Sequence, residues 1–251
     1  MILIGFSVAS IVESVWIRIL LFVLGTLLTV RVFNSSRLSC SYHDLFWVVM
    51  AVVLTTIIII KHPIVNNHDY LLTIAVIMIA VSLYHNSAPQ YLEWCSRLIL
   101  VVVMLAAVQA KVFSADYLSG EMFYHLLSND VRFASVDDMF AKVLTIFPNI
   151  WFPISTSSTI LSKVLTWWTI IIELLVGLSF VVFTPSKSLA PHIMLGIFIL
   201  LTYTLIPISP FGVVLAALGL ASAGTGFTHR LQISIGYWTL VVIILIARYL
   251  L

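Results

Sequence analysis

The sequence predicts an all-α fold, a polytopic membrane helix bundle with seven or eight spans and an interfacial or re-entrant helical segment between spans four and five. Hydrophobic residues make up 62% of the chain and charged residues only 9%, and the mean hydropathy is +1.16. Soluble domains carry roughly 25% charged residues, so this composition indicates an integral membrane protein. The apolar stretches also approach the length of about 20 residues that a helix needs to cross a bilayer.

A single integral membrane domain over residues 1–251 is expected, because no polar block is large enough to fold separately. The net charge of +2 is too small to indicate a nucleic-acid partner. The N-terminus, MILIGFSVASIVESVW, lacks the basic region and cleavage site of a signal peptide, so we expect it to be retained. The two cysteines, Cys40 and Cys95, share no metal-binding spacing. We expect two unlinked thiols and no metal site.

The apolar stretches fall on both sides of a long polar segment. Those before it cover about residues 15–33, 44–60, 70–84 and 91–110. Those after it cover about residues 158–183, 189–206, 211–223 and 231–251. The sequence PISP separates two of the later stretches, and each of its prolines removes a backbone donor, so we expect a helix break there.

Basic residues near the ends of the spans indicate an orientation through the positive-inside rule. These residues are Arg31, Arg37, Lys187 and Arg230. If the loops that carry them are cytoplasmic, the N-terminus and the 111–157 segment lie on the opposite side. We therefore predict a multi-pass protein of the bacterial inner membrane with an extracytoplasmic helical segment over about residues 111–157.

Residues 111–133, KVFSADYLSGEMFYHLLSNDVRF, open the polar segment between the fourth and fifth spans. Apolar residues at three- and four-residue spacing predict a helix over about residues 116–127. Polar residues interleave with them, so this helix would lie in the membrane interface or re-enter against the bundle. Ser114 or Asp116 is expected to cap its start. A second short helix is expected to begin after Ser135.

Ionisable residues at membrane depth are candidates for function, because a charge is costly to bury there. Glu173 lies well inside the fifth span and needs a proton, a hydrogen-bonding partner or a cation. It is either a functional group or half of a structural ion pair, with Arg18 and Arg97 as the expected basic partners. Lys111 ends the fourth span and is either a general base whose pKa burial has lowered or a snorkelling interfacial lysine.

Other polar residues give weaker signals. Lys163 and His192 stand near span ends, where snorkelling accounts for both. His125 is either a group that titrates near neutral pH or an ordinary satisfied polar residue. The adjacent tryptophans of TWWT are expected to face lipid or to pack in the core rather than to form a cofactor cage. Thr202 belongs to a polar notch that helix–helix hydrogen bonding would explain.

The 111–133 stretch resembles the core of the HTTM (horizontally transferred transmembrane) family, which includes the vitamin K-dependent gamma-glutamyl carboxylases. In that family a span ending in lysine leads into an (A/S)-D-(Y/W)-x-x-G pattern and then an amphipathic stretch rich in aromatics. The matching residues are Ala115, Asp116, Tyr117 and Gly120. An arginine in an early span, here Arg18, and an acidic residue in the span after the loop, here Glu173, agree with the family as well.

The resemblance implies an all-helical bundle with its working face on the extracytoplasmic side and a pocket for a vitamin K-like quinone or a lipid. On this basis the candidate catalytic residues are Lys111, Glu173 and Asp116. The candidate cofactor-binding residues are Arg18, Tyr117, His125 and Thr202.

The chain departs from the carboxylases at three points. They carry two lysines at this span end, and the second is held to be the base that deprotonates vitamin K hydroquinone. Lys111 matches the first lysine, whereas Val112 stands at the second position. Thr202 lies near the position of a histidine that is common in the family. We also expect no soluble C-terminal region of the kind that recognises a propeptide.

Two functions remain open from the sequence. The first is a reduced family member that keeps a quinone- or lipid-facing pocket and assists modification or maturation of a partner peptide or protein. The second is a non-enzymatic accessory or structural subunit of a larger membrane protein complex, which the missing second lysine, the missing histidine and the small number of polar residues facing the interior favour. A transporter or channel is less attractive, because the PISP break has no counterpart elsewhere in the chain.

Overall fold

The computed structural model describes residues 41–61, 67–83, 88–129, 154–203, 209–224 and 228–250. Within these ranges every regular element is a helix, so the all-α prediction is confirmed for them. The helices are α3 (Ser41–Lys61), α4 (Asn67–Leu83), α5 (Ala88–Val112), α6 (Ala115–Leu118), α7 (Glu121–Asn129), α9 (Ile154–Val182), α10 (Ala190–Tyr203), α11 (Ser209–Ser222) and α12 (Arg230–Leu250). Three predicted features lie outside the described residues: the first span with Arg18, Cys40, and the short helix after Ser135.

Two of the described helices are long and apolar enough to cross a membrane, Pro89–Val112 within α5 and Leu161–Val182 within α9. Shorter apolar helices accompany them, namely Leu45–Ile59, Asp69–Ser82, Ala190–Tyr203, Phe211–Ser222 and Arg230–Ile244. Each apolar stretch predicted within the described ranges is therefore a helix. That the shorter ones also span a membrane stays a prediction.

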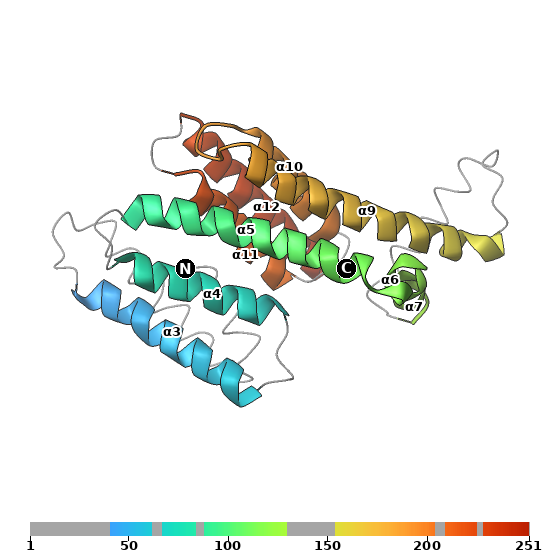
Figure 1. Cartoon of the computed structure of the whole chain (residues 1–251), viewed down its shortest axis with the longest axis horizontal. Helices are drawn as coiled ribbons and strands as arrows, with labels where there is room; N and C mark the ends of the chain where they lie inside the picture. The colour runs from blue at the N-terminus through green and yellow to red at the C-terminus, as the bar shows by residue number, and fades with distance from the viewer. Residues whose placement is uncertain are drawn as a thin grey trace.

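Helix α5 lies at the centre of the arrangement. It packs against α4, α9 and α11, and α3 packs on the far side of α4. Figure 1 shows α9 running beside α5 and extending past its end, where α6 and α7 lie against α9. Helices α10, α11 and α12 pack on one another, and α10 also contacts α9.

An apolar core joins these helices. Leu100 of α5, Phe180 of α9, Leu195 of α10 and Leu215 of α11 are each fully buried. Helix α9 approaches α5 closely at Gly177, where a β-carbon would lie 3.1 Å from a methyl carbon of Leu105. Small residues allow such close approach of apolar helices, and the contact sets the spacing at which polar groups of α5 and α9 meet.

Arg97 of α5 binds the C-terminal end of α9. Its Nε donates to the carbonyl oxygen of Phe180 at 2.7 Å and its Nη2 to that of Val181 at 3.0 Å. The last carbonyls of a helix lack partners within the helix, and a cation there also interacts favourably with the helix dipole. The prediction that Arg97 pairs with Glu173 is therefore wrong, because its guanidinium is committed to the end of α9.

The helix predicted over residues 116–127 forms as two helices, α6 and α7. Gly120 divides them with a φ of +84°, a left-handed conformation that disfavours residues with a β-carbon. Ser114 is the N-cap of α6, and its hydroxyl accepts a hydrogen bond from the backbone N–H of Tyr117 at 3.3 Å. Of the two predicted caps, Ser114 is the correct one.

An apolar face of α6 and α7 packs on the N-terminal half of α9. Tyr117 and Phe123 form one buried cluster with Ile170, and Leu127 forms another with Leu161. The rings of Tyr117 and Phe123 meet edge to face at a centroid distance of 5.6 Å. The segment thus packs on α9, and its placement in the membrane interface or as a re-entrant segment stays a prediction.

Candidate functional site

Lys111 and Glu173 form an ion pair where the last turn of α5 meets the middle of α9. The Nζ of Lys111 donates to Oε1 of Glu173, and 20% and 10% of the two side chains are exposed. The structure thus brings together two of the three candidate catalytic residues. It also shows that the basic partner of Glu173 among the described residues is Lys111, whereas Arg18 or Arg97 was expected.

The second carboxylate oxygen of Glu173, Oε2, is buried and has no partner in the part of the chain that the structure describes. No donor within the described ranges forms a hydrogen bond to Oε2. A carboxylate offers about four acceptor sites, so Lys111 satisfies only part of this one. Leaving a buried acceptor unsatisfied costs about 1–3 kcal/mol, and such an oxygen is suited to accept a hydrogen bond from a bound hydroxyl group.

Tyr117 of α6 covers the ammonium group of Lys111. The Nζ atom lies 5.5 Å from the centroid of the ring, within the range of a cation–π interaction. Tyr117 is 6% exposed, and its hydroxyl lies 2.5 Å from Oγ1 of Thr169. Burial raises the pKa of Tyr117 to about 12; the Thr169 hydroxyl lowers this pKa, and the negative charge of Glu173 adds to the increase. The phenol is therefore neutral at physiological pH.

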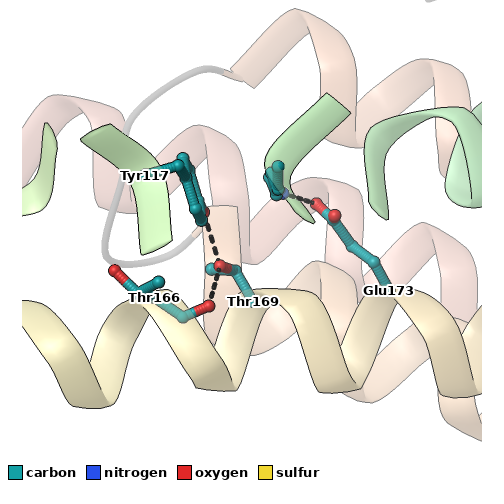
Figure 2. Close-up of polar contacts among 5 residues, drawn as sticks. Tyr117, Thr166, Thr169 and Glu173 are labelled. Carbon is teal, nitrogen blue, oxygen red and sulfur yellow. Dashed lines mark hydrogen bonds and ion pairs between the residues drawn. The ribbon is translucent and has the colours of Figure 1, made fainter. Parts of the chain in front are cut away.

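Thr166, Thr169 and Glu173 lie along one face of α9, and Tyr117 points toward them from α6, as Figure 2 shows. The Thr169 hydroxyl donates to the carbonyl oxygen of Thr166 at 2.9 Å, so its oxygen accepts the hydrogen of Tyr117. The Thr166 hydroxyl in turn donates to the carbonyl oxygen of Ser162 at 2.9 Å. Intervals of three and four residues place all three side chains on one helix face, a signal that the sequence contained.

The remaining candidate residues lie apart from this ion pair or outside the described ranges. Asp116 is exposed in the first turn of α6 and forms no ion pair within the described ranges. His125 is exposed, with its Nε2 3.7 Å from a carboxylate oxygen of Glu121 one turn earlier in α7. The Oγ1 of Thr202 is buried with no hydrogen-bond partner among the described residues, so the expected interhelical bond is not formed there. Arg18 lies outside the described residues.

His192 is buried, which corrects the prediction that it snorkels at a span end. It is 5% exposed, with Nε2 3.0 Å from the carbonyl oxygen of Pro185 and Nδ1 3.2 Å from the hydroxyl of Tyr237. A carbonyl oxygen only accepts, so the proton is on Nε2 and Tyr237 donates to Nδ1. His192 therefore joins α10 to α12 and to the turn before α10.

Several other predicted side chains are placed as follows. Lys163 is exposed, as snorkelling requires. Trp167 and Trp168 are 53% and 41% exposed, which favours their lipid-facing interpretation. Val112, which the predicted resemblance aligns with the second carboxylase lysine, is 43% exposed and follows Lys111 directly. Cys95 is a free thiol.

In the part of the chain that the structure describes, no group of three or more His, Cys, Asp or Glu side chains is placed to hold a metal ion. Comparison of the chain with family models, with curated proteins and with solved structures found no match. The HTTM resemblance stays a prediction from short motifs, and function is inferred from the site itself.

Proposed function

We propose that this chain is a polytopic membrane protein of the HTTM type with seven or eight spans. In this proposal it binds a quinone or lipid that carries a hydroxyl group at the Lys111–Glu173 pair, and it assists modification or maturation of a partner peptide or protein. The observation that carries the proposal is a largely buried ion pair in which one carboxylate oxygen, Oε2 of Glu173, has no hydrogen-bond partner among the described residues.

The exposed apolar surface supports a membrane location. Trp94, Leu98 and Val102 recur every four residues on one face of α5 and are 70%, 62% and 55% exposed. Val164 and Leu175 of α9 are likewise 57% and 45% exposed. Soluble monomers rarely expose contiguous apolar patches beyond a few hundred Å², whereas helices that face lipid do so throughout.

Within the pair, Glu173 is the group suited to act as a base. The ammonium of Lys111 has three hydrogens and no lone pair, whereas Oε2 of Glu173 is an acceptor to which no described residue donates. A ligand hydroxyl at Oε2 would transfer its proton there, breaking its O–H bond and leaving an oxyanion. Lys111 would stabilise that oxyanion electrostatically, and Tyr117 limits access of water to the pair. This assignment needs no second lysine at Val112.

Quinone binding to the purified protein tests the proposal. The hydroquinone form of a vitamin K-like naphthoquinone, whose two hydroxyl groups can donate to Oε2, would be titrated into wild-type protein in nanodiscs under reducing conditions, with tryptophan fluorescence quenching as the readout. Hydrogen bonds to charged groups contribute about 1.5–3 kcal/mol, so Glu173→Gln and Lys111→Met should each weaken binding by about tenfold or more. Glu121→Gln, which changes an exposed carboxylate of α7, is the matched control and should bind like wild type. Absence of binding in wild type, or unchanged binding in both site variants, would contradict the proposal.

A second candidate function is a non-enzymatic accessory or structural subunit of a larger membrane protein complex. The same ion pair favours it, since Lys111 and Glu173 also join α5 to α9, and so does Val112 in place of a second lysine. Purification in mild detergent tests this function. A stoichiometric partner that remains bound supports it, and a chain that elutes as a lone monomer contradicts it.

A further inference from the structure

A cavity of about 380 Å³ lies between α5, α11 and α12, lined by none of the residues of the Lys111–Glu173 site. Its volume is in the range of sites that hold small ligands, about 300–1,000 Å³. Leu92 of α5, Val213, Ala217 and Leu220 of α11 and Val241 of α12 form its apolar wall. The small side chains of α11 leave the space that a larger residue would fill.

Tyr237 is the buried polar residue of the lining, and its hydroxyl already donates a hydrogen bond outside the cavity. Tyr237 is 5% exposed and donates its hydroxyl hydrogen to Nδ1 of His192, whose Nε2 is bound to Pro185. Gly219 of α11 leaves room for the Tyr237 ring in this position, because a β-carbon there would lie 2.6 Å from Cζ of Tyr237. The hydroxyl hydrogen of Tyr237 is thus unavailable to a ligand, and the interior is better suited to hydrocarbon than to a polar head group.

Arg230 is the charged residue of the lining. It is exposed and forms no ion pair with any residue that the structure describes. Glu93, next to the lining residue Leu92 on α5, packs instead against Gly224. Arg230 begins α12, where the positive end of the helix dipole disfavours a cation unless an anion is also bound. An anionic group at Arg230 would neutralise both positive charges.

We propose that this cavity binds one acyl chain of an anionic membrane phospholipid, with the lipid phosphate on the guanidinium of Arg230. The apolar wall matches the chain, and a guanidinium binds phosphate through two parallel hydrogen bonds. Basic residues between membrane helices recognise anionic head groups in this way. The inference rests on the membrane location in the proposed function and is independent of the chemistry at Glu173.

Native mass spectrometry tests the inference on the full chain. Phosphatidylglycerol and phosphatidylcholine with the same acyl chains would be added to the delipidated protein in detergent. Wild type should bind one phosphatidylglycerol at least tenfold more tightly than phosphatidylcholine. Arg230→Gln should abolish this preference, and Ala217→Phe, which fills the cavity from α11, should weaken binding of both lipids. Lys187→Gln, which changes an exposed lysine in the turn before α10, should retain the wild-type preference.

Three results would overturn the inference: equal binding of the two lipids to wild type, an unchanged preference in Arg230→Gln, or a dimer that Ala217→Phe disperses. The last would assign the cavity to a second copy of the chain. If wild type shows no preference between the two lipids but still binds the naphthohydroquinone, this inference alone is rejected. Release of the chain from membranes by alkaline carbonate would reject the membrane location on which both proposals rest.

Discussion

Replacing Lys111 by methionine should destabilise the protein more than the same replacement of an exposed lysine. The substitution keeps an unbranched apolar side chain that matches lysine up to Cε and removes the ammonium. The Glu173 side chain, which is 10% exposed, then lacks its cation. Removing one partner of a buried ion pair costs about 3–5 kcal/mol. Because Lys111 is itself 20% exposed, we expect about 3 kcal/mol, at the lower end of that range. At about 2–4 °C per kcal/mol for a chain of this size, Tm should fall by about 6–12 °C.

The double variant Lys111→Met/Glu173→Gln distinguishes the cost of an unpaired buried charge from the cost of losing the ion pair as a whole. It removes both charges, and replacing a whole buried pair is often neutral, whereas breaking one is not. We therefore expect the double variant to be more stable than Lys111→Met alone. The coupling between the two positions should be about 2 kcal/mol, within the range found for residues in contact.

Thermal unfolding of the purified protein in detergent, followed by tryptophan fluorescence, measures both effects. Lys187→Met, which changes an exposed lysine in the turn before α10, is the control and should unfold like wild type. A Tm for Lys111→Met equal to that of the control would refute the reasoning, as would purely additive effects in the double variant.

Two further predictions concern the same end of the bundle. Gly120→Ala should lower the free energy of unfolding by about 1–2 kcal/mol in a denaturant titration, because φ is +84° and the new β-carbon would lie 3.1 Å from Cγ of Lys163. Gly236→Ala, with nothing within 4 Å of its β-carbon, is the control and should not destabilise; equal losses in both would contradict this account. The raised pKa of Tyr117, about 12 against the usual 10.0, favours the neutral phenol in the folded state. The stability that Tyr117 contributes is fully present below pH 10 and should be lost between pH 10 and pH 12, which lowers the free energy of unfolding by about 2–3 kcal/mol. The measurement is the free energy of unfolding at pH 9 and at pH 12. The decrease due to Tyr117 should be present in wild type and absent in Tyr117→Phe. An identical pH dependence in the two proteins would contradict the assignment.

The sequence was sufficient for features that depend on local interactions. Each apolar stretch predicted within the described ranges is a helix, because a long run of apolar helix formers between polar breaks decides its own secondary structure. The cap depends on residues within one helical turn, and the sequence limited it to Ser114 or Asp116, of which the structure selects Ser114. The division of the predicted 116–127 helix at Gly120 was missed, because an isolated glycine is compatible with both a helix interior and a left-handed break.

Only the tertiary structure decided which polar groups meet. Lys111 and Glu173 are 62 residues apart in the sequence, and their pairing requires α5 and α9 to lie side by side at one particular offset. The same packing directs Arg97 to the end of α9, although the sequence favoured Arg97 as a partner of Glu173. His192 is buried for a similar reason, since Tyr237 of α12 reaches it from 45 residues away. Hydrophobic burial is non-directional and dictates that helices pack, whereas the fit between particular side chains dictates which helix faces meet.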